Sequence, residues 1–277
     1  MKRVVTIQDI SCIGRCSLTV ALPIISAFEI ETCVIPTAVL SQHTAFESFS
    51  FRDLTDEIPK IAKQWQDSGF TFDAIYTGYM GSGQQIDLVL DFFDRFRPDP
   101  SLIIVDPAMA DNGRLYTGFD ESFVSHMRRL VSKADVIIPN LTEAALLLGE
   151  SYRPDGYDGA AIGDLLHRLA GLGCKKIIIT GVSTGKNELG AACYDSAKND
   201  FYLYSGQKYD HIYHGTGDIF SSVITGCLVR GMDLRKAVRH AVDFTRSCIS
   251  FTESDPAAGW YGVNFESALK DIPGFLR

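Results

Sequence analysis

The chain of 277 residues lacks the features that would place it in a membrane or on nucleic acid. No apolar run approaches the roughly 18 residues that a transmembrane helix needs. Residues 1–7 are too short in apolar length for a secretory signal peptide, so none is expected. Lys and Arg number 26 against 34 Asp and Glu, and the net charge of −8 argues against nucleic acid or an anionic membrane as the main partner.

The seven cysteines do not form a pattern that builds a structural site. They are scattered and odd in number, and no Cys-x-x-Cys occurs, so neither a disulfide framework nor a zinc site is expected. A reducing, cytoplasmic compartment suits such a chain. Linkers, repeats and low-complexity segments are not evident either. With hydrophobic residues at 46%, the sequence predicts one globular domain over residues 1–277.

Short apolar runs alternate with helical patterns along most of the chain. This alternation predicts an α/β fold with three layers, αβα, in which helices flank a central, mostly parallel sheet. The predicted strands are residues 3–8, 32–37, 74–78, 102–106, 136–139 and 176–180, followed by an antiparallel hairpin of 191–195 and 201–204. The predicted helices are residues 17–28, 53–67, 84–96, 121–132, 141–148, 163–172, 218–230, 234–251 and 265–269.

Polar residues follow most of the predicted parallel strands, although a purely structural sheet does not need them there. Ligands of parallel α/β sheets bind beyond the carboxyl ends of the strands. The sequence therefore predicts a binding site at that edge. The residues at these strand ends are Gln8, Asp9, Thr37, Thr77, Gly78, Tyr79, Asp106, Pro139, Asn140, Thr180 and Gly181.

The turn from His214 to Asp218 reads His-Gly-Thr-Gly-Asp and runs into a helical pattern. Gly215 and Gly217 let a ligand approach the main chain closely, and the first N–H groups of a helix favour a phosphate. Asp218 would repel that phosphate, but an acid is useful there if it takes a proton from an attacking hydroxyl. The alternative is an ordinary helix start that Thr216 or Asp218 caps.

Two carboxylates are candidates for a magnesium site. Asp106 ends a predicted strand, and Glu143 lies three residues after Asn140 at the start of a predicted helix. Magnesium usually takes one or two carboxylates together with water and substrate phosphates. Two alternatives stay open: Asn140 and Glu143 form a capping box, and Asp106 is a turn aspartate before Pro107. The capping box and the ligand role can hold together.

Weaker patterns concern the nucleotide and the substrate. The stretch 181–187 superficially resembles a Walker A loop, but it has three residues between its glycines and Asn187 at the position of the required Ser or Thr. It is therefore not a P-loop. Aromatic residues gather from Tyr202 to Tyr213, either as outward side chains of a strand or as a flap that shields an aromatic ring. His43 follows the second predicted strand closely enough for its loop to reach a ligand; the alternative is a structural or exposed histidine.

Taken together, these residues resemble pyridoxal kinases of the ribokinase-like superfamily, nearly from end to end. The resemblance implies ATP-dependent phosphorylation of the 5′-hydroxymethyl group of pyridoxal, pyridoxine or pyridoxamine, in vitamin B6 salvage. It further implies magnesium bound with ATP, activation by potassium, and a homodimer. The matching elements are Ile7-Gln8 with Gly14, residues 28–30, residues 40–44, Thr77-Gly78-Tyr79, Val105-Asp106-Pro107, residues 134–140 with Glu143, and Gly215-Thr216-Gly217-Asp218.

The same resemblance implies a role for each matching residue. Asp218 is the general base on the hydroxyl, and the amides of Gly215, Thr216 and Gly217 form the anion hole. The implied contacts to the substrate are Asp9, His43, Thr44, Tyr79 and Asp218. The implied contacts to ATP are Asp106, Asn140, Glu143, Thr180, Tyr213, Gly215, Thr216 and Gly217, with Asp106 and Glu143 near the metal.

Asp9 departs from the family pattern. Ser-His usually follows Ile-Gln at the end of the first strand, whereas this chain has Asp9-Ile10. An acid there favours a cationic amine or a protonated ring nitrogen, which leaves the preferred vitamer open. Arg15 in the following loop either binds an anion or is simply exposed. Two rival functions stay open: a hydroxymethylpyrimidine kinase of thiamine synthesis, and a protein that binds a B6 vitamer or nucleotide without turning it over.

Overall fold

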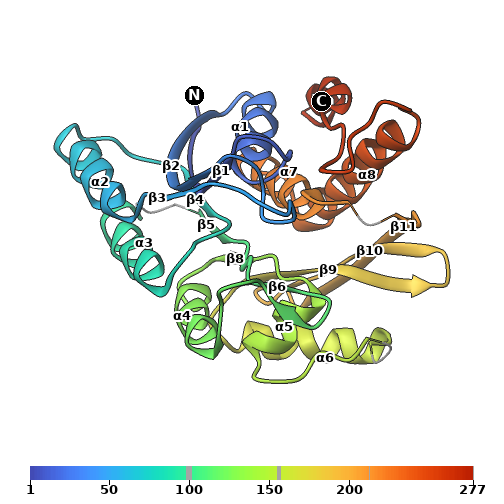
Figure 1. The fold of residues 1–277 in the computed structure, drawn as a ribbon. Helices are drawn as coiled ribbons and strands as arrows, with labels where there is room; N and C mark the ends of the chain where they lie inside the picture. Colours follow the sequence, from blue (N-terminus) through green and yellow to red (C-terminus); the bar gives the residue numbers. More distant parts are fainter. Residues whose placement is uncertain (98–101, 155–156, 212, 277) are drawn as a thin grey trace.

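The computed structural model describes residues 1–97, 102–154, 157–211 and 213–276. Its described strands form one nine-stranded sheet, in the order β11-β10-β9-β8-β5-β4-β1-β2-β3, and the small hairpin β6-β7 (Figure 1). The strands from β9 to β2 pair in parallel, and antiparallel strands close both edges. The strand bounds are β1 Arg3–Ser11, β2 Glu31–Leu40, β3 Phe51–Asp53, β4 Ala74–Thr77, β5 Leu102–Val105, β6 Ala110–Asp111, β7 Arg114–Leu115, β8 Val136–Ile137, β9 Lys176–Gly185, β10 Glu188–Asp195 and β11 Asp200–Gln207.

Helices cover both faces of the sheet, which confirms the predicted three-layer αβα fold (Figure 1). Successive residues of a strand point to opposite faces. Val4, Tyr76 and Ile104 therefore pack toward α1, α7 and α8, whereas Val5 and Ile75 pack toward α2 to α6. None of the described helices is both long and apolar enough to cross a bilayer. The helix bounds are α1 Leu18–Ala27, α2 Ile58–Asp67, α3 Gly83–Phe96, α4 Glu121–Val131, α5 Leu141–Leu147, α6 Gly159–Ala170, α7 Thr216–Val229, α8 Leu234–Glu253 and α9 Ile272–Phe275, with 3₁₀ turns at Thr55–Glu57 and Glu266–Asp271.

Several predicted elements have different limits in the structure; α6, for example, begins at Gly159, before the predicted start at residue 163. The helix expected over residues 53–67 is wrong at its start, because Phe51–Asp53 forms the edge strand β3 and α2 begins only at Ile58. The Asp53 Oδ1 atom accepts a hydrogen bond from the Thr55 N–H at 2.7 Å, which turns the chain out of the strand. The hairpin expected over 191–195 and 201–204 is longer, because β10 already begins at Glu188 and β11 runs from Asp200 to Gln207, and its neighbour β9 continues to Gly185. The stretch 181–187 thus belongs to the hairpin of β9 and β10. This placement agrees with its rejection as a P-loop.

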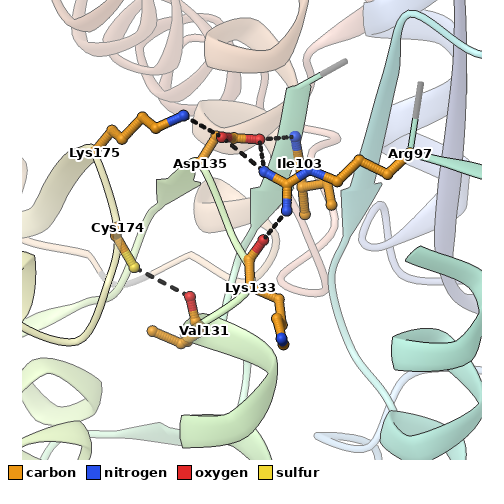
Figure 2. A network of polar contacts seen from close by, with 7 residues as sticks. All are labelled: Arg97, Ile103, Val131, Lys133, Asp135, Cys174 and Lys175. Atoms are coloured by element: carbon orange, nitrogen blue, oxygen red, sulfur yellow. Dashed lines mark hydrogen bonds and ion pairs between the residues drawn. The ribbon is translucent and has the colours of Figure 1, made fainter. Parts of the chain in front are cut away.

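Asp135 joins four elements at the amino end of the parallel strands (Figure 2). It accepts hydrogen bonds from Arg97 Nη2 at 3.0 and 3.1 Å, from the Ile103 N–H at 3.0 Å and from Lys175 Nζ at 3.3 Å. Arg97 also donates to the Lys133 carbonyl at 3.1 Å. The buried carboxylate therefore fixes the ends of α3, β5, β8 and β9 relative to one another, on the side of the sheet away from the predicted binding edge.

We expect Asp135→Ala to lower the free energy of unfolding by about 2–3 kcal/mol, because a buried N–H group and two cations lose their acceptor. Urea unfolding measures this change. The matched control is Asp91→Ala, which removes an exposed pair with Arg95 on α3 and should cost less than about 0.5 kcal/mol. Equal effects of the two substitutions would contradict the role given to Asp135.

Candidate active site

The predicted site residues converge at the carboxyl ends of the parallel strands. Asp9 lies near the end of β1, Asp106 directly follows β5, and α7 begins at the same edge. Ser221 in the second turn of α7 donates a hydrogen bond to Asp106 Oδ2 at 2.7 Å. An isolated parallel bridge joins Asn140 to Thr180. The sheet edge and the start of α7 therefore belong to one cluster of polar groups.

Gly215 is the N-cap residue of α7, and its backbone is left-handed with φ 80°. A Cβ atom at this position would lie 2.1 Å from the Arg15 carbonyl oxygen, so only glycine fits. No described side chain caps the helix, and the alternative that Thr216 or Asp218 caps it is wrong. The Thr216 hydroxyl instead donates to the Tyr213 carbonyl at 3.2 Å. The first N–H groups of α7 thus begin a helix without a side-chain cap, as an anion site requires.

Asp218 lies in the first turn of α7 and is partly exposed. Burial raises the pKa of its carboxyl to about 7. The backbone of Ser17 acts in the opposite direction, and the negative charges of Asp106 and Asp9 add to the rise. A carboxyl group whose pKa lies near neutrality is well matched to accept a proton from an alcohol.

Asp106 and Glu143 are buried and close enough for each charge to affect the other. Burial raises the pKa of Asp106 to about 6, while the Ser221 hydrogen bond lowers it. Burial also raises the pKa of Glu143, and the Asp106 charge adds to that rise. A divalent cation would relieve this repulsion, so the donor chemistry fits magnesium. Among the described residues, no group of three or more His, Cys, Asp or Glu side chains is placed to hold an ion.

Glu143 also has a structural role. Its Oε2 atom accepts from the Asn140 N–H at 2.9 Å, and Asn140 Oδ1 accepts from the Glu143 N–H at 2.9 Å, so the capping box is confirmed. Glu143 Oε1 accepts from the N–H groups of Met109 at 3.1 Å and Ala110 at 3.4 Å. The Asn140 amide donates to the Ala110 carbonyl at 2.7 Å. The loop after Asp106 is thereby fixed to the start of α5.

Tyr116 is a site residue that sequence reasoning missed. It directly follows β7, and its N–H donates to the Met109 carbonyl at 2.9 Å. Burial raises the pKa of its phenol, and the charges of Glu143, Asp111, Asp106 and Asp218 raise it further. The phenol therefore lies near these acids, on a residue that is 40% exposed overall. The only sequence signal was the Asp111-Asn112-Gly113 turn, which the two-residue strands β6 and β7 flank.

Asp9 and Tyr79 come from two neighbouring strands, since Asp9 lies near the end of β1 and Tyr79 follows β4. The Ser11 hydroxyl donates to Asp9 Oδ2 at 3.0 Å. Burial raises the pKa of Asp9, while hydrogen bonds from Ser17 and Ser11 lower it. Burial raises the pKa of Tyr79 to about 12, with a contribution from the Asp9 charge. The Tyr79 ring stacks on Phe119 with 5.6 Å between centroids.

His43 reaches the turn before α7 and is held by two hydrogen bonds. Its Nδ1 atom accepts from the Ala45 N–H at 3.2 Å, which leaves the proton on Nε2 to bond the Tyr261 carbonyl at 3.0 Å. Burial lowers the pKa of the ring, consistent with this neutral form. The His43 ring lies 5.0 Å from that of His214. The other predicted contacts differ in exposure: Thr44 is exposed, whereas Thr180 and Tyr213 are partly buried.

The sheet order and the glycine-capped helix define a ribokinase-like α/β protein. Within that class the chain belongs to the phosphomethylpyrimidine kinase family, whose family model matches residues 22–264. It is 42% identical to a candidate phosphomethylpyrimidine kinase from Bacteroides thetaiotaomicron VPI-5482, in a crystal form with pyridoxal, with a TM-score of 0.94 over 98% of this chain and 96% of that chain.

Two proteins named pyridoxal kinase are also similar. The crystal structure of the Lactobacillus plantarum protein is 30% identical, with a TM-score of 0.91 over 99% of this chain and 97% of that chain. The Dictyostelium discoideum protein is 28% identical over 267 residues, which cover 91% of this chain and 87% of that protein. The resemblance to pyridoxal kinases of the ribokinase-like superfamily is thereby confirmed.

We expect Gly215→Ala to cost about 2–3 kcal/mol of stability, because alanine would adopt a left-handed backbone and collide with the Arg15 carbonyl. Gly217→Ala is the matched control in the same turn, because no atom lies within 4 Å of its added Cβ. Thermal unfolding of both variants measures the difference. A destabilisation shared equally by the two would show that the close approach to Arg15 is not the cause.

Proposed function

We propose that this protein transfers the γ-phosphoryl group of ATP to the 5′-hydroxymethyl group of pyridoxal, pyridoxine or pyridoxamine. The observation that carries the proposal is the position of Asp218, a carboxyl with a pKa of about 7 in the first turn of the glycine-capped helix α7. A protein that only binds a phosphate has little use for an acid there. The pyridoxal in a crystal form of the Bacteroides relative supports the choice of ring.

The chain's own groups divide the work of an in-line transfer. Asp218 accepts the proton of the hydroxyl as that oxygen attacks phosphorus. The N–H groups at the start of α7, from Thr216 and Gly217, hold the oxygens of the transferred group, where the helix dipole favours negative charge. Asp106 and Glu143 are the residues that would hold magnesium, which when bound neutralises phosphate charge. Tyr79 and Thr44 are the proposed contacts to the ring.

The remaining expectations are proposals of the same kind. Asn140, Thr180 and Tyr213 are proposed contacts to ATP, and His43 supports the substrate loop. Potassium activation and a homodimer rest on the family resemblance. A cytoplasmic setting is supported by the thiols, since all seven cysteines, each in the described part of the chain, are free.

Asp218→Asn tests the proposed base. We expect turnover to fall by about 10²–10⁴-fold while ATP still binds, because only the proton acceptor is lost. In the unsubstituted protein, kcat/KM should fall about tenfold per pH unit below a pH of about 7, since Asp218 is then protonated and cannot accept a proton. Steady-state kinetics across pH measure both effects. Near-normal turnover of the Asn variant would exclude Asp218 as the base.

A hydroxymethylpyrimidine kinase is the second candidate function. Asp9 favours it, because an acid in the position of the family's serine suits the amino group of an aminopyrimidine. The family description also names a pyrimidine. Either ring presents a hydroxymethyl group to the same base, so the two functions differ in the acceptor and share the chemistry.

Asp9→Ser separates the two candidate rings. We expect kcat/KM for pyridoxamine and hydroxymethylpyrimidine to fall about 10–100-fold relative to pyridoxine, because a charge-assisted hydrogen bond to an amino group is lost. Asp9→Asn is the matched control that keeps the shape and removes the charge. ADP release with pyridoxal, pyridoxine, pyridoxamine and hydroxymethylpyrimidine is the readout. Unchanged preferences among all four would show that Asp9 does not contact the acceptor. Ligand binding without ADP release from any of them would favour a non-catalytic binding protein.

A further inference from the structure

Arg15 lies in the loop between β1 and α1, and its side chain is bound to the C-terminal part of the chain. Arg15 Nε donates to Glu266 Oε1 at 2.8 Å, and Nη1 donates to Asn264 Oδ1 at 2.5 Å. Both partners lie about 250 residues away along the chain. The guanidinium is thus neutralised by an acid and turned toward the C-terminal segment.

Asn264 is itself held in place from two sides. Its N–H donates to the Thr252 hydroxyl at 2.8 Å, and its side-chain amide donates to Asp255 Oδ2 at 2.9 Å. Gly262 packs so closely on this loop that an added Cβ would lie 2.6 Å from the Gly14 carbonyl oxygen. The C-terminal segment is therefore a fixed support for the loop, anchored at the end of α8.

The supported loop has an unfavourable backbone conformation. Arg15 has φ 47° and Ser17 has φ 50°, both in the left-handed region that side chains rarely adopt. Such a backbone is strained and persists only when its surroundings hold it. A contact from elsewhere in the fold is therefore needed to keep the loop in this conformation.

This loop conformation touches both the glycine turn and the base. The Arg15 carbonyl presses against Gly215, at the point where a Cβ would collide with it. The backbone of Ser17 is near enough to Asp218 to lower the pKa of its carboxyl. Any relaxation of the loop would therefore change the position of the turn and of Asp218 together.

We propose that Arg15 is a positioning residue, and that its tether to Asn264 and Glu266 holds the loop that orients Asp218 and the start of α7. The proposal rests on the proposed phosphoryl transfer. Arg15 acts through the loop backbone and does not contact the phosphate. Because an exposed ion pair contributes little to global stability, the tether should affect turnover more than unfolding.

Arg15→Ala should lower kcat about 10–100-fold, since a misplacement of about 1 Å near reacting groups can cost that much. The dissociation constant for ATP and the unfolding temperature should change little. Arg15→Lys, which keeps a cation opposite Glu266, should recover a large part of kcat. The matched control is Arg230→Ala, which removes another surface pair, Arg230 Nη2 to Glu29 Oε2 at 3.0 Å, and should leave kcat unchanged.

The double variant Asn264→Ala/Glu266→Ala tests the tether from its other end and leaves Arg15 in place. If the tether positions the loop, this variant loses kcat as Arg15→Ala does. If Arg15 is instead a direct phosphate ligand, releasing it leaves kcat unchanged or raises it, and the proposal is overturned. An unchanged kcat in Arg15→Ala overturns it as well.

Amide hydrogen exchange separates failure of this proposal from failure of the proposed function. Exchange at residues 14–18 and 215–219 should accelerate in Arg15→Ala and in the double variant, and not in Arg230→Ala. This readout does not need activity. An unsubstituted protein that transfers no phosphoryl group to any acceptor refutes the function, while unchanged exchange in both tether variants refutes the positioning role.

Discussion

The confinement of three carboxyl groups to one edge of a buried sheet is the constraint on which the rest of the site depends. The charge of Asp106 acts on both Glu143 and Asp218, and burial disfavours the charged form of each of the three. Nearby polar groups stabilise the charged forms. Ser221 donates to Asp106 and three backbone N–H groups donate to Glu143, while the Ser17 backbone lowers the pKa of Asp218. These donors lower the cost of burial only in part. The remaining electrostatic strain favours a cation between the first two acids and a proton acceptor at the third.

At the opposite edge of the same sheet, the protein itself compensates the charge of a buried acid. There Asp135 is surrounded by Arg97 and Lys175 and by a backbone N–H, so its charge is compensated within the protein (Figure 2). No described cation pairs with Asp106 or Glu143 in this way. A buried acid with protein cations around it stabilises a fold, whereas a buried acid without them is available to a ligand. The two ends of the strands therefore separate stability from chemistry.

Much of this arrangement could be predicted, because it depends on local signals. Parallel strands buried on both faces are continuous apolar runs, and the residue after each run marks the ligand edge. Asp106 was found in this way, and the turn at Gly215 was found from its two glycines and the helical pattern after them. The edge strand β3 and the hairpin β6-β7 were missed because strands of two or three residues have no measurable periodicity. Tyr116 was missed with the hairpin that carries it.

The contacts of Arg15 could not be predicted for another reason. Its partners are separated from it by most of the chain, and nothing in the local sequence distinguishes a tethered arginine from an exposed one. The left-handed backbone at Arg15 and Ser17 could not be predicted from a single sequence either, since neither residue is glycine. Only the folded chain shows that this loop meets the turn at Gly215.

Ser17 connects substrate recognition to catalysis. Its backbone lowers the pKa of Asp218, the proposed base, and its side chain lowers that of Asp9, the residue that departs from the family pattern. A group on the acceptor that draws the Asp9 carboxylate toward itself would therefore also act on the loop that orients the base. Because one residue influences the charge of both acids, we expect a change at Asp9 to alter the proposed base as well, so that the choice of ring and the rate of transfer change together.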